Sequence, residues 1–180
     1  LVVDSVRTPM KFNNLKAEKE KVVIEKLKDI RNSQLIYKTI NNEYAATFDT
    51  LIQFLKEGEI PVVKIVPDPE DTTFTKTIND TLGYISVADS VLGRKAGYAI
   101  DSIRYIPFSG GKEFNIEAGE IKSGGITVNV FEVSALYTDF LRGMNEQLII
   151  NLIKAKEDID RFPGLKVGSM VEASTDGNWE

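Results

Sequence analysis

The residues KVVIEKLKDIRNSQLIYKTINNEYAATFDTLIQFL, positions 21–55, decide the fold of this chain. In their first part, alternating steps of four and three residues mark one face of a helix, formed by Val23, Leu27, Ile30, Gln34 and Tyr37. No Gly or Pro interrupts residues 16–40, which predicts a helix of about 25 residues and about 37 Å. We expect this helix to pack through Val23, Leu27, Ile30 and Tyr37 and to project in part beyond a compact core.

A turn and a second helix follow the long helix. Asn41 and Asn42 favour the end of the first helix. Thr47 is a candidate cap for a helix over residues 49–57, which Gly58 would end. Residues 1–15 contain Pro9 and show no period, so we expect a lead-in there and one domain over residues 16–180.

The remaining sequence combines strand patterns with short helical ones. Strands are expected over residues 60–66, 84–87, 103–108 and 165–173, with an exposed acidic loop over 68–80. The strongest β signal is a hairpin of residues 113–121 and 126–134, joined by a short glycine-containing loop. Helical patterns return over residues 136–142 and 145–162. The order predicts an α+β fold: a long N-terminal helix packed on a mainly antiparallel sheet, with additional shorter helices.

The composition excludes several kinds of chemistry. The chain has 180 residues, no Cys and no His. Without Cys there is no disulfide, no thiolate nucleophile and no Cys-bound zinc, and without His the common catalytic triads are missing. An acidic loop around Asp68 lacks the twelve-residue calcium pattern, and residues 109–112 miss the phosphate-loop spacing. We therefore expect a protein that is not an enzyme and that binds no cofactor or metal.

Charge is distributed unevenly along the chain. The formal net charge is −5, which argues against the positive field of a nucleic-acid-binding protein. Residues 7–38 carry nine basic and four acidic side chains, a net +5 that leaves −10 for the other residues. A solvated helix face explains this segment, and a basic stalk close to anionic lipid headgroups is the alternative.

A short tripeptide is over-represented. Asp, then Ser or Thr, then an aliphatic residue or Thr occurs six times, where the composition predicts about 0.6 occurrences; such a hydroxyl can carry a bulky surface glycan. The hydroxyl residues concerned are Ser5, Thr50, Thr72, Thr81, Ser90 and Ser102. Helix caps and turns, where Asp before Ser or Thr is common, are the competing explanation. The tripeptides resemble the acceptor motif of the general O-glycosylation systems of some Gram-negative bacteria, which implies an envelope location.

Two family resemblances point in the same direction. Residues 21–55 resemble the region that follows the membrane span in type IV pilins and pseudopilins, with Tyr37, the Asn41-Asn42 turn, Tyr44 and Leu51 at matching places. The whole chain, including SIRYIPFSGGKEFNIEAG (102–119) and PGLKVGSMVEASTDGNWE (163–180), is similar to uncharacterised single-pass membrane-anchored domains of Gram-negative bacteria. This resemblance implies an anchor before Leu1 and a domain that faces the periplasm or the exterior.

These observations leave three classes of function open. The leading hypothesis is a non-enzymatic envelope domain for assembly or protein interaction, with a protein partner or a second copy and no nucleic acid. A carbohydrate- or peptide-binding module would use exposed rings such as Tyr98 or Tyr105. A carboxylate hydrolase would need two acidic side chains facing each other across a cleft, and the spacing identifies no such pair.

Overall fold

A computed structural model describes residues 2–70, 72–73, 75–93 and 99–180, with side chains from Thr8 onward. The helices are α1 (Val2–Asn41), α2 (Phe48–Glu57), α3 (Val87–Leu92), the 3₁₀ helix η1 (Ile100–Arg104), α4 (Tyr137–Phe140) and α5 (Glu146–Glu157). The strands are β1 (Glu59–Pro67), β2 (Thr77–Ser86), β3 (Asn115–Ser123), β4 (Ile126–Leu136) and β5 (Gly164–Gly168). The fold is α+β, as expected, with two separate antiparallel sheets, one of β1 and β2 and one in the order β3-β4-β5.

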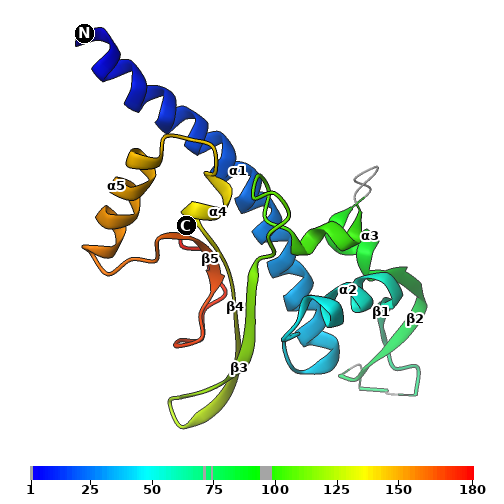
Figure 1. Cartoon of the computed structure of the whole chain (residues 1–180). Helices are drawn as coiled ribbons and strands as arrows, with labels where there is room; N and C mark the ends of the chain where they lie inside the picture. The colour runs from blue at the N-terminus through cyan, green and yellow to red at the C-terminus, as the bar shows by residue number, and fades with distance from the viewer. Residues whose placement is uncertain (1, 71, 74, 94–98) are drawn as a thin grey trace.

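Helix α1 is the central element of the fold, and the other elements lie beside it (Figure 1). It begins at Val2, so the expectation that the helix starts at about residue 16, after a lead-in over residues 1–15, is wrong in its starting point. The N-terminal end of the helix projects beyond the body (Figure 1), and most of the side chains over residues 8–18 are exposed. A helix segment that is exposed on most sides has no apolar stripe for the sequence to show. Phe12 is the exception there, because its side chain is buried with the core residues.

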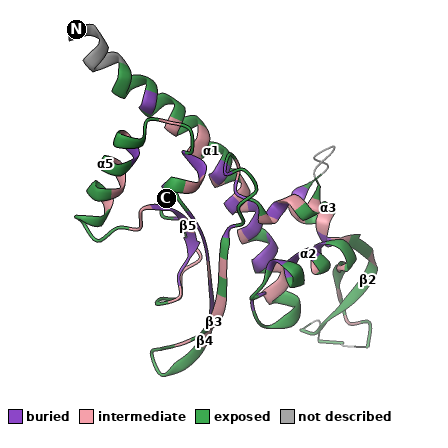
Figure 2. Ribbon diagram, viewed as in Figure 1, coloured by how far each residue is buried: buried purple, intermediate pink, exposed green. Residues whose placement is uncertain are grey.

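The second half of α1 supplies one wall of the core. Val23, Leu27 and Ile30 are fully buried, as the periodicity predicted (Figure 2). Tyr37 is half-buried and meets the ring of Phe54 edge-on, with ring centroids 5.0 Å apart. The helix ends where Asn42 adopts a left-handed φ of 61°, a conformation that Asn tolerates better than most residues.

Helix α2 has the predicted caps. The Thr50 N–H donates to Thr47 Oγ1 at 3.3 Å, and the Gly58 N–H donates to the Phe54 carbonyl at 2.8 Å. Leu51 and Leu55, on the buried face of α2, are fully enclosed by the core shared with α1.

The three-stranded sheet lies along α1 on the other side. Its β3–β4 hairpin turns through Gly124 and Gly125, both with positive φ, which confirms the predicted glycine turn. Strand β5 adds to β4 over five residues and contacts α1. Phe131 and Val133 of β4 and Val167 of β5 are buried in the common core.

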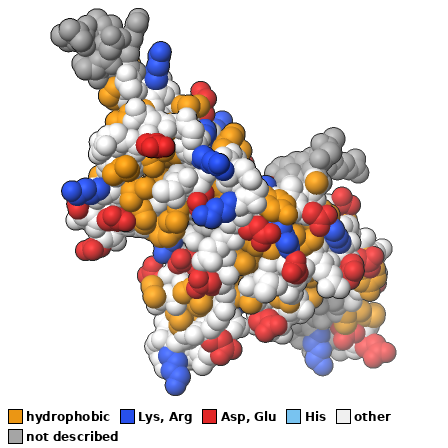
Figure 3. Space-filling model, in the orientation of Figure 1, with side chains coloured by type: hydrophobic (Ala, Val, Ile, Leu, Met, Phe, Trp, Pro, Cys, Tyr) orange, Lys and Arg blue, Asp and Glu red, His pale blue; other side chains and the backbone are white. Residues whose placement is uncertain are grey.

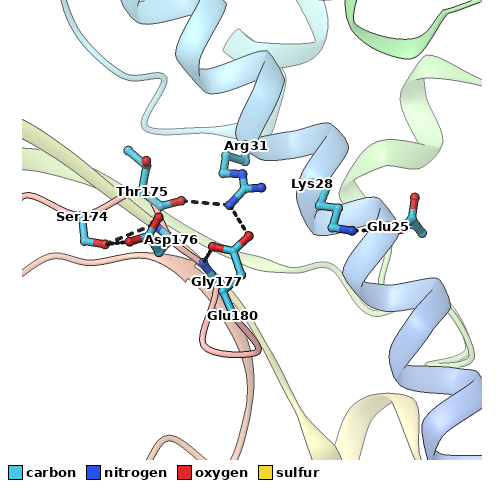
Figure 4. Close-up of polar contacts among 8 residues, drawn as sticks. All are labelled: Glu25, Lys28, Arg31, Ser174, Thr175, Asp176, Gly177 and Glu180. Carbon is cyan, nitrogen blue, oxygen red and sulfur yellow. Dashed lines mark hydrogen bonds and ion pairs between the residues drawn. The ribbon is translucent and has the colours of Figure 1, made fainter.

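The C-terminal residues fasten the sheet to α1 (Figure 4). Arg31 Nη1 lies 2.9 Å from Glu180 Oε1 and also donates to the Thr175 carbonyl at 3.5 Å. Glu180 Oε2 accepts the Gly177 N–H at 3.1 Å, and Gly177 forms a β-bridge with Val167. The chain end is therefore part of the folded body.

Three expected strands differ from the structure. The strand expected over residues 165–173 is shorter, because β5 ends at Gly168, whose φ is positive. The loop expected over residues 68–80 is shorter, because β2 already begins at Thr77 and includes residues 84–86 of the strand expected over 84–87, while Val87 begins α3. Residues 103–108 are not a strand: η1 occupies their first part, and Tyr105 forms only an isolated bridge to Glu113. Pro107 has no N–H for a ladder, and Ser109 closes a turn by donating its hydroxyl to the Ile106 carbonyl at 2.7 Å.

Candidate interaction surface

The β1–β2 hairpin stands apart from the three-stranded sheet, at the end of the molecule that α2 and α3 form (Figure 1). Its strands pair from Glu59 opposite Ser86 to Pro67 opposite Thr77, with a bulge where the register shifts between Val62 and Val63. Successive side chains of a strand point to opposite faces. One face therefore carries Val62 and Val66, and the other carries Val63 and Ile65.

Apolar side chains are exposed on both faces of this hairpin. Seven large hydrophobic residues of β1 and β2 have between 39% and 67% of their surface exposed: Val62, Val63, Ile65, Ile78, Leu82, Tyr84 and Ile85. Figure 2 colours most of the hairpin as exposed, and Figure 3 shows hydrophobic side chains reaching the surface at this end of the molecule. A soluble surface rarely exposes a contiguous apolar patch without a function for it.

The two edges of the hairpin differ. Pro61 and Pro67 lie six residues apart in β1, so their nitrogens point to the same side of the strand. The Asp68 N–H donates to the Lys76 carbonyl, so the proline nitrogens face away from β2, where a proline is tolerated. The outer edge of β1 therefore lacks two hydrogen-bond donors. Strand β2 contains no proline over its ten residues and lies at the margin of the molecule (Figure 1). Its outer edge is the better template for a further strand.

A polar cleft of about 400 Å³ lies between α2 and η1. Lys56 Nζ lies 2.7 Å from Asp101 Oδ1, Arg104 pairs with Asp49, and Arg104 Nη1 lies 3.3 Å from Glu113 Oε1. The hydrogen bond from Lys56 lowers the pKa of Asp101, and the hydrogen bond with Asp49 raises the pKa of Arg104. These ion pairs join α2 to η1. Each charged side chain that takes part is paired with a nearby side chain of opposite charge.

The aromatic lining of the cleft differs from that of the sugar platform considered for this chain. Tyr105 is the one aromatic side chain among its described lining residues, whereas a sugar platform was expected to gather several rings. Tyr98 lies outside the described residues. Among the described residues, no group of three or more acidic side chains is arranged to hold a metal ion.

The candidate glycan acceptors lie at one end of the molecule. Thr50, Thr72, Thr81 and Ser90 are exposed and Ser102 is half-buried, so no described acceptor is enclosed in the core. All five belong to the region from α2 to η1, while the Ser5 side chain lies outside the described part of the chain. The Thr50 hydroxyl is already within 3.0 Å of the Thr47 hydroxyl at the cap of α2, which is the competing structural role.

Of the four helix residues predicted for packing, three are fully buried and one is partly exposed. Val23, Leu27 and Ile30 contact the chain's own core and are unavailable to a partner, while Tyr37 keeps a partly exposed ring against Phe54. The two-sided hairpin was missed as a binding surface, although the sequence carries a signal for it. In residues 60–66, apolar side chains occupy both odd and even positions. The same pattern is typical of an ordinary buried strand, so by itself it does not predict a binding surface.

No protein-family model matches this chain, and no curated protein or solved structure matches it either. Within the described residues, none of the helices has the length and hydropathy that a membrane span requires.

Proposed function

We propose that this chain is a non-enzymatic protein-interaction domain of the cell envelope that binds its partner through the β1–β2 hairpin. The observation that carries the proposal is the exposure of apolar side chains on both faces of a hairpin with a free edge. Ile65 and Tyr84 are each 67% exposed, and an unpartnered surface of this kind is costly to keep in water.

The rest of the fold supports this use of the hairpin. A two-stranded hairpin is marginal on its own, so it must be held at its base. Val87, directly after β2, is fully buried and donates its N–H to the Gly58 carbonyl, directly before β1, at 2.9 Å. Both strands therefore leave the body from one fixed point, and α2 and α3, which contact β2, support it there.

The envelope part of the proposal rests on the acceptor tripeptides. Five described acceptors are accessible or partly accessible, as a glycosyltransferase acting on a folded substrate would require. Thr81 lies opposite Val63 in the register, so a glycan there would stand over one face of the hairpin and leave the edge of β2 open. We propose O-glycosylation at Thr50, Thr72, Thr81, Ser90 and Ser102.

Photo-cross-linking in the native host tests the interaction surface. A photoreactive phenylalanine analogue replaces Ile65 or Tyr84 in the hairpin, and Val171 serves as a control that is 86% exposed but lies after β5. We expect adducts of defined mass from the two hairpin positions and none from position 171. Adducts from all three positions, or from position 171 alone, would contradict the proposal.

The intact mass of the protein purified from its native host tests the modification. We expect sugar masses above that of the bare chain, reduced stepwise when the acceptors are replaced by Ala one at a time. A mass equal to that of the bare chain would rule the modification out.

A further inference from the structure

Basic and aromatic side chains meet where the segment after η1 lies beside α1 (Figure 1). Lys19 Nζ lies 5.1 Å from the centre of the Phe108 ring, and Lys26 Nζ donates to the Tyr105 carbonyl at 2.8 Å. Arg142 reaches the same segment, because its guanidinium donates to the carbonyl of the residue after Phe108 at 3.5 Å. Three cations therefore border two exposed rings on one surface.

The hydrogen bonds of the two lysines go to the main chain. Lys19 Nζ donates to the carbonyls of Phe140 and Arg142 at 3.2 and 3.3 Å. Within the described residues, no carboxylate lies within ion-pair distance of Lys19, Lys26 or Arg142. Burial lowers the pKa of Lys26, and the charge of Asp29 offsets this effect only in part. A partly dehydrated ammonium group of this kind gains more from an added carboxylate than an exposed one does.

Phe108 has an unfavourable backbone conformation although its ring is exposed. Its φ is 65°, in the left-handed region that bulky side chains rarely adopt. The ring is 49% exposed, so burial in the core does not compensate for the strain. Backbone strain of this kind clusters at ligand-binding sites, where it fixes the position of a contact group. The ring of Phe108 is therefore placed for contact with a partner, next to Lys19.

The exposed side of α1 next to the cations carries two aliphatic side chains. Leu15 and Val22 are 44% and 45% exposed. Val22 follows Lys19 by three residues and precedes Lys26 by four, so it lies between the two lysines on one face. The aliphatic pair and the basic pair each repeat after seven residues, which is about 10.5 Å along a helix. A second helix that lies along α1 has the same rise, so its own residues seven apart can meet both pairs.

We propose that a second docking surface, the basic face of α1, binds an acidic amphipathic helix of a partner protein. The basic face consists of Leu15, Lys19, Val22, Lys26, Phe108 and Arg142. It lies outside the β1–β2 hairpin, so this inference goes beyond the proposed function. Aliphatic side chains of the partner helix cover the aliphatic pair, and its carboxylates pair with the three cations.

The charges around the basic face favour a protein partner over a broad anionic surface. Glu18 and Glu25 follow Leu15 and Val22 by three residues each, on the side away from the lysines. These carboxylates would repel the phosphates of a membrane or a nucleic acid, which need a wider positive field than three cations supply. The net charge of −5 does not prevent a local contact, because physiological salt screens charges over about 8 Å.

A synthetic helix tests the chemistry of the partner. The probe is a fluorescently labelled, alanine-based peptide of about 20 residues, long enough to be helical, in which Leu and Glu each repeat every seven residues. The control peptide has Lys in place of each Glu. We expect fluorescence anisotropy to show that the acidic peptide binds the full chain, with an affinity that falls as salt is added, and that the basic peptide does not bind.

Substitutions in the full chain locate the site. Lys19→Glu and Lys26→Glu should each raise the dissociation constant about tenfold. Lys21→Glu, an equal change of charge at an exposed position of the same helix, should leave it nearly unchanged. Phe108→Gly removes the ring and the strained side chain together, so it should weaken binding without lowering the urea midpoint of unfolding.

Equal affinity for the acidic and the basic peptide, or equal losses in Lys21→Glu and Lys26→Glu, would overturn the proposal. Vesicles of anionic phospholipid provide a further test. If they bind the chain, lose affinity in the same lysine variants, and the acidic peptide does not bind, the basic face meets a membrane and the helix partner is wrong. These results are independent of the cross-links from the hairpin, so failure here leaves the proposed function to its own test.

Discussion

At the scale of single residues, Gln34 joins α1 to the segment before α2. Its side chain is fully buried, Nε2 donates to the Ala45 carbonyl at 2.8 Å, and Oε1 accepts the Ala45 N–H at 2.9 Å. Both polar groups of Ala45 are thereby satisfied inside the core. Sequence periodicity placed Gln34 on the buried face, but it could not identify the main-chain partner, because that contact depends on the path of the turn.

Replacing Gln34 with Leu should destabilise the protein by about 2–5 kcal/mol, because two buried main-chain groups lose their partners at nearly constant side-chain volume. Urea denaturation followed by circular dichroism measures the change. Asn32→Ala, at an exposed position of the same helix, should stay within about 0.5 kcal/mol of wild type. A Gln34→Leu protein as stable as wild type would contradict this role.

We expect the attachment of the chain end to depend on pH through Glu180. The hydrogen bond from Arg31 lowers the pKa of Glu180 in the folded protein. A lowered folded pKa means that the stabilisation is present above the ordinary glutamate pKa and is lost as the pH falls through the folded value. Trp179, the single tryptophan of the chain, is partly buried beside it.

We therefore expect the fluorescence of Trp179 to report release of the chain end when the pH falls below about 4.3, the ordinary value for Glu. Glu180→Gln should remove this transition and show the released signal at neutral pH. An identical titration in wild type and in the Gln variant would exclude Glu180 as its source.

At the scale of elements, α1 performs different tasks along its length. Its second half buries Val23, Leu27 and Ile30, whereas Met10 and Leu15 in the first half are exposed. The packing half was predictable, because an amphipathic stripe records burial directly. The projecting half was not, because an exposed helix leaves no comparable pattern.

Leu27→Ala should cost about 2–5 kcal/mol of stability, since it removes a fully buried side chain from the core. Leu15→Ala, on the same helix but 44% exposed, should change stability by about 0.5 kcal/mol or less. Denaturant midpoints compare the two. Equal effects would show that the core does not rest on the second half of α1.

The two hairpins show that strands, too, are predictable only where the local sequence carries a pattern for them. The β3–β4 hairpin was predicted because Gly124 and Gly125 provide the turn and the flanking residues alternate. The start of β2 was missed, because residues 68–80 are polar and Thr-rich and their pairing depends on β1. Separation into two sheets is a tertiary property that no local pattern encodes.

At the scale of the whole molecule, α1 connects two regions with different surfaces (Figure 1). The three-stranded sheet, α4, α5 and the chain end pack along it. The region from α2 to η1 holds the exposed hairpin and every described candidate acceptor for a glycan. The proposed interaction surface and the proposed glycan acceptors thus both lie at the end of the molecule opposite the projecting start of α1.

The central claim is that the exposed β1–β2 hairpin is the surface through which this protein binds its partner. Photo-cross-linking in the native host from positions 65 and 84, with the exposed position 171 as the control, tests it most directly. We predict adducts of defined mass from the two hairpin positions and none from position 171. Adducts from position 171 alone, or equally from all three positions, would contradict the claim.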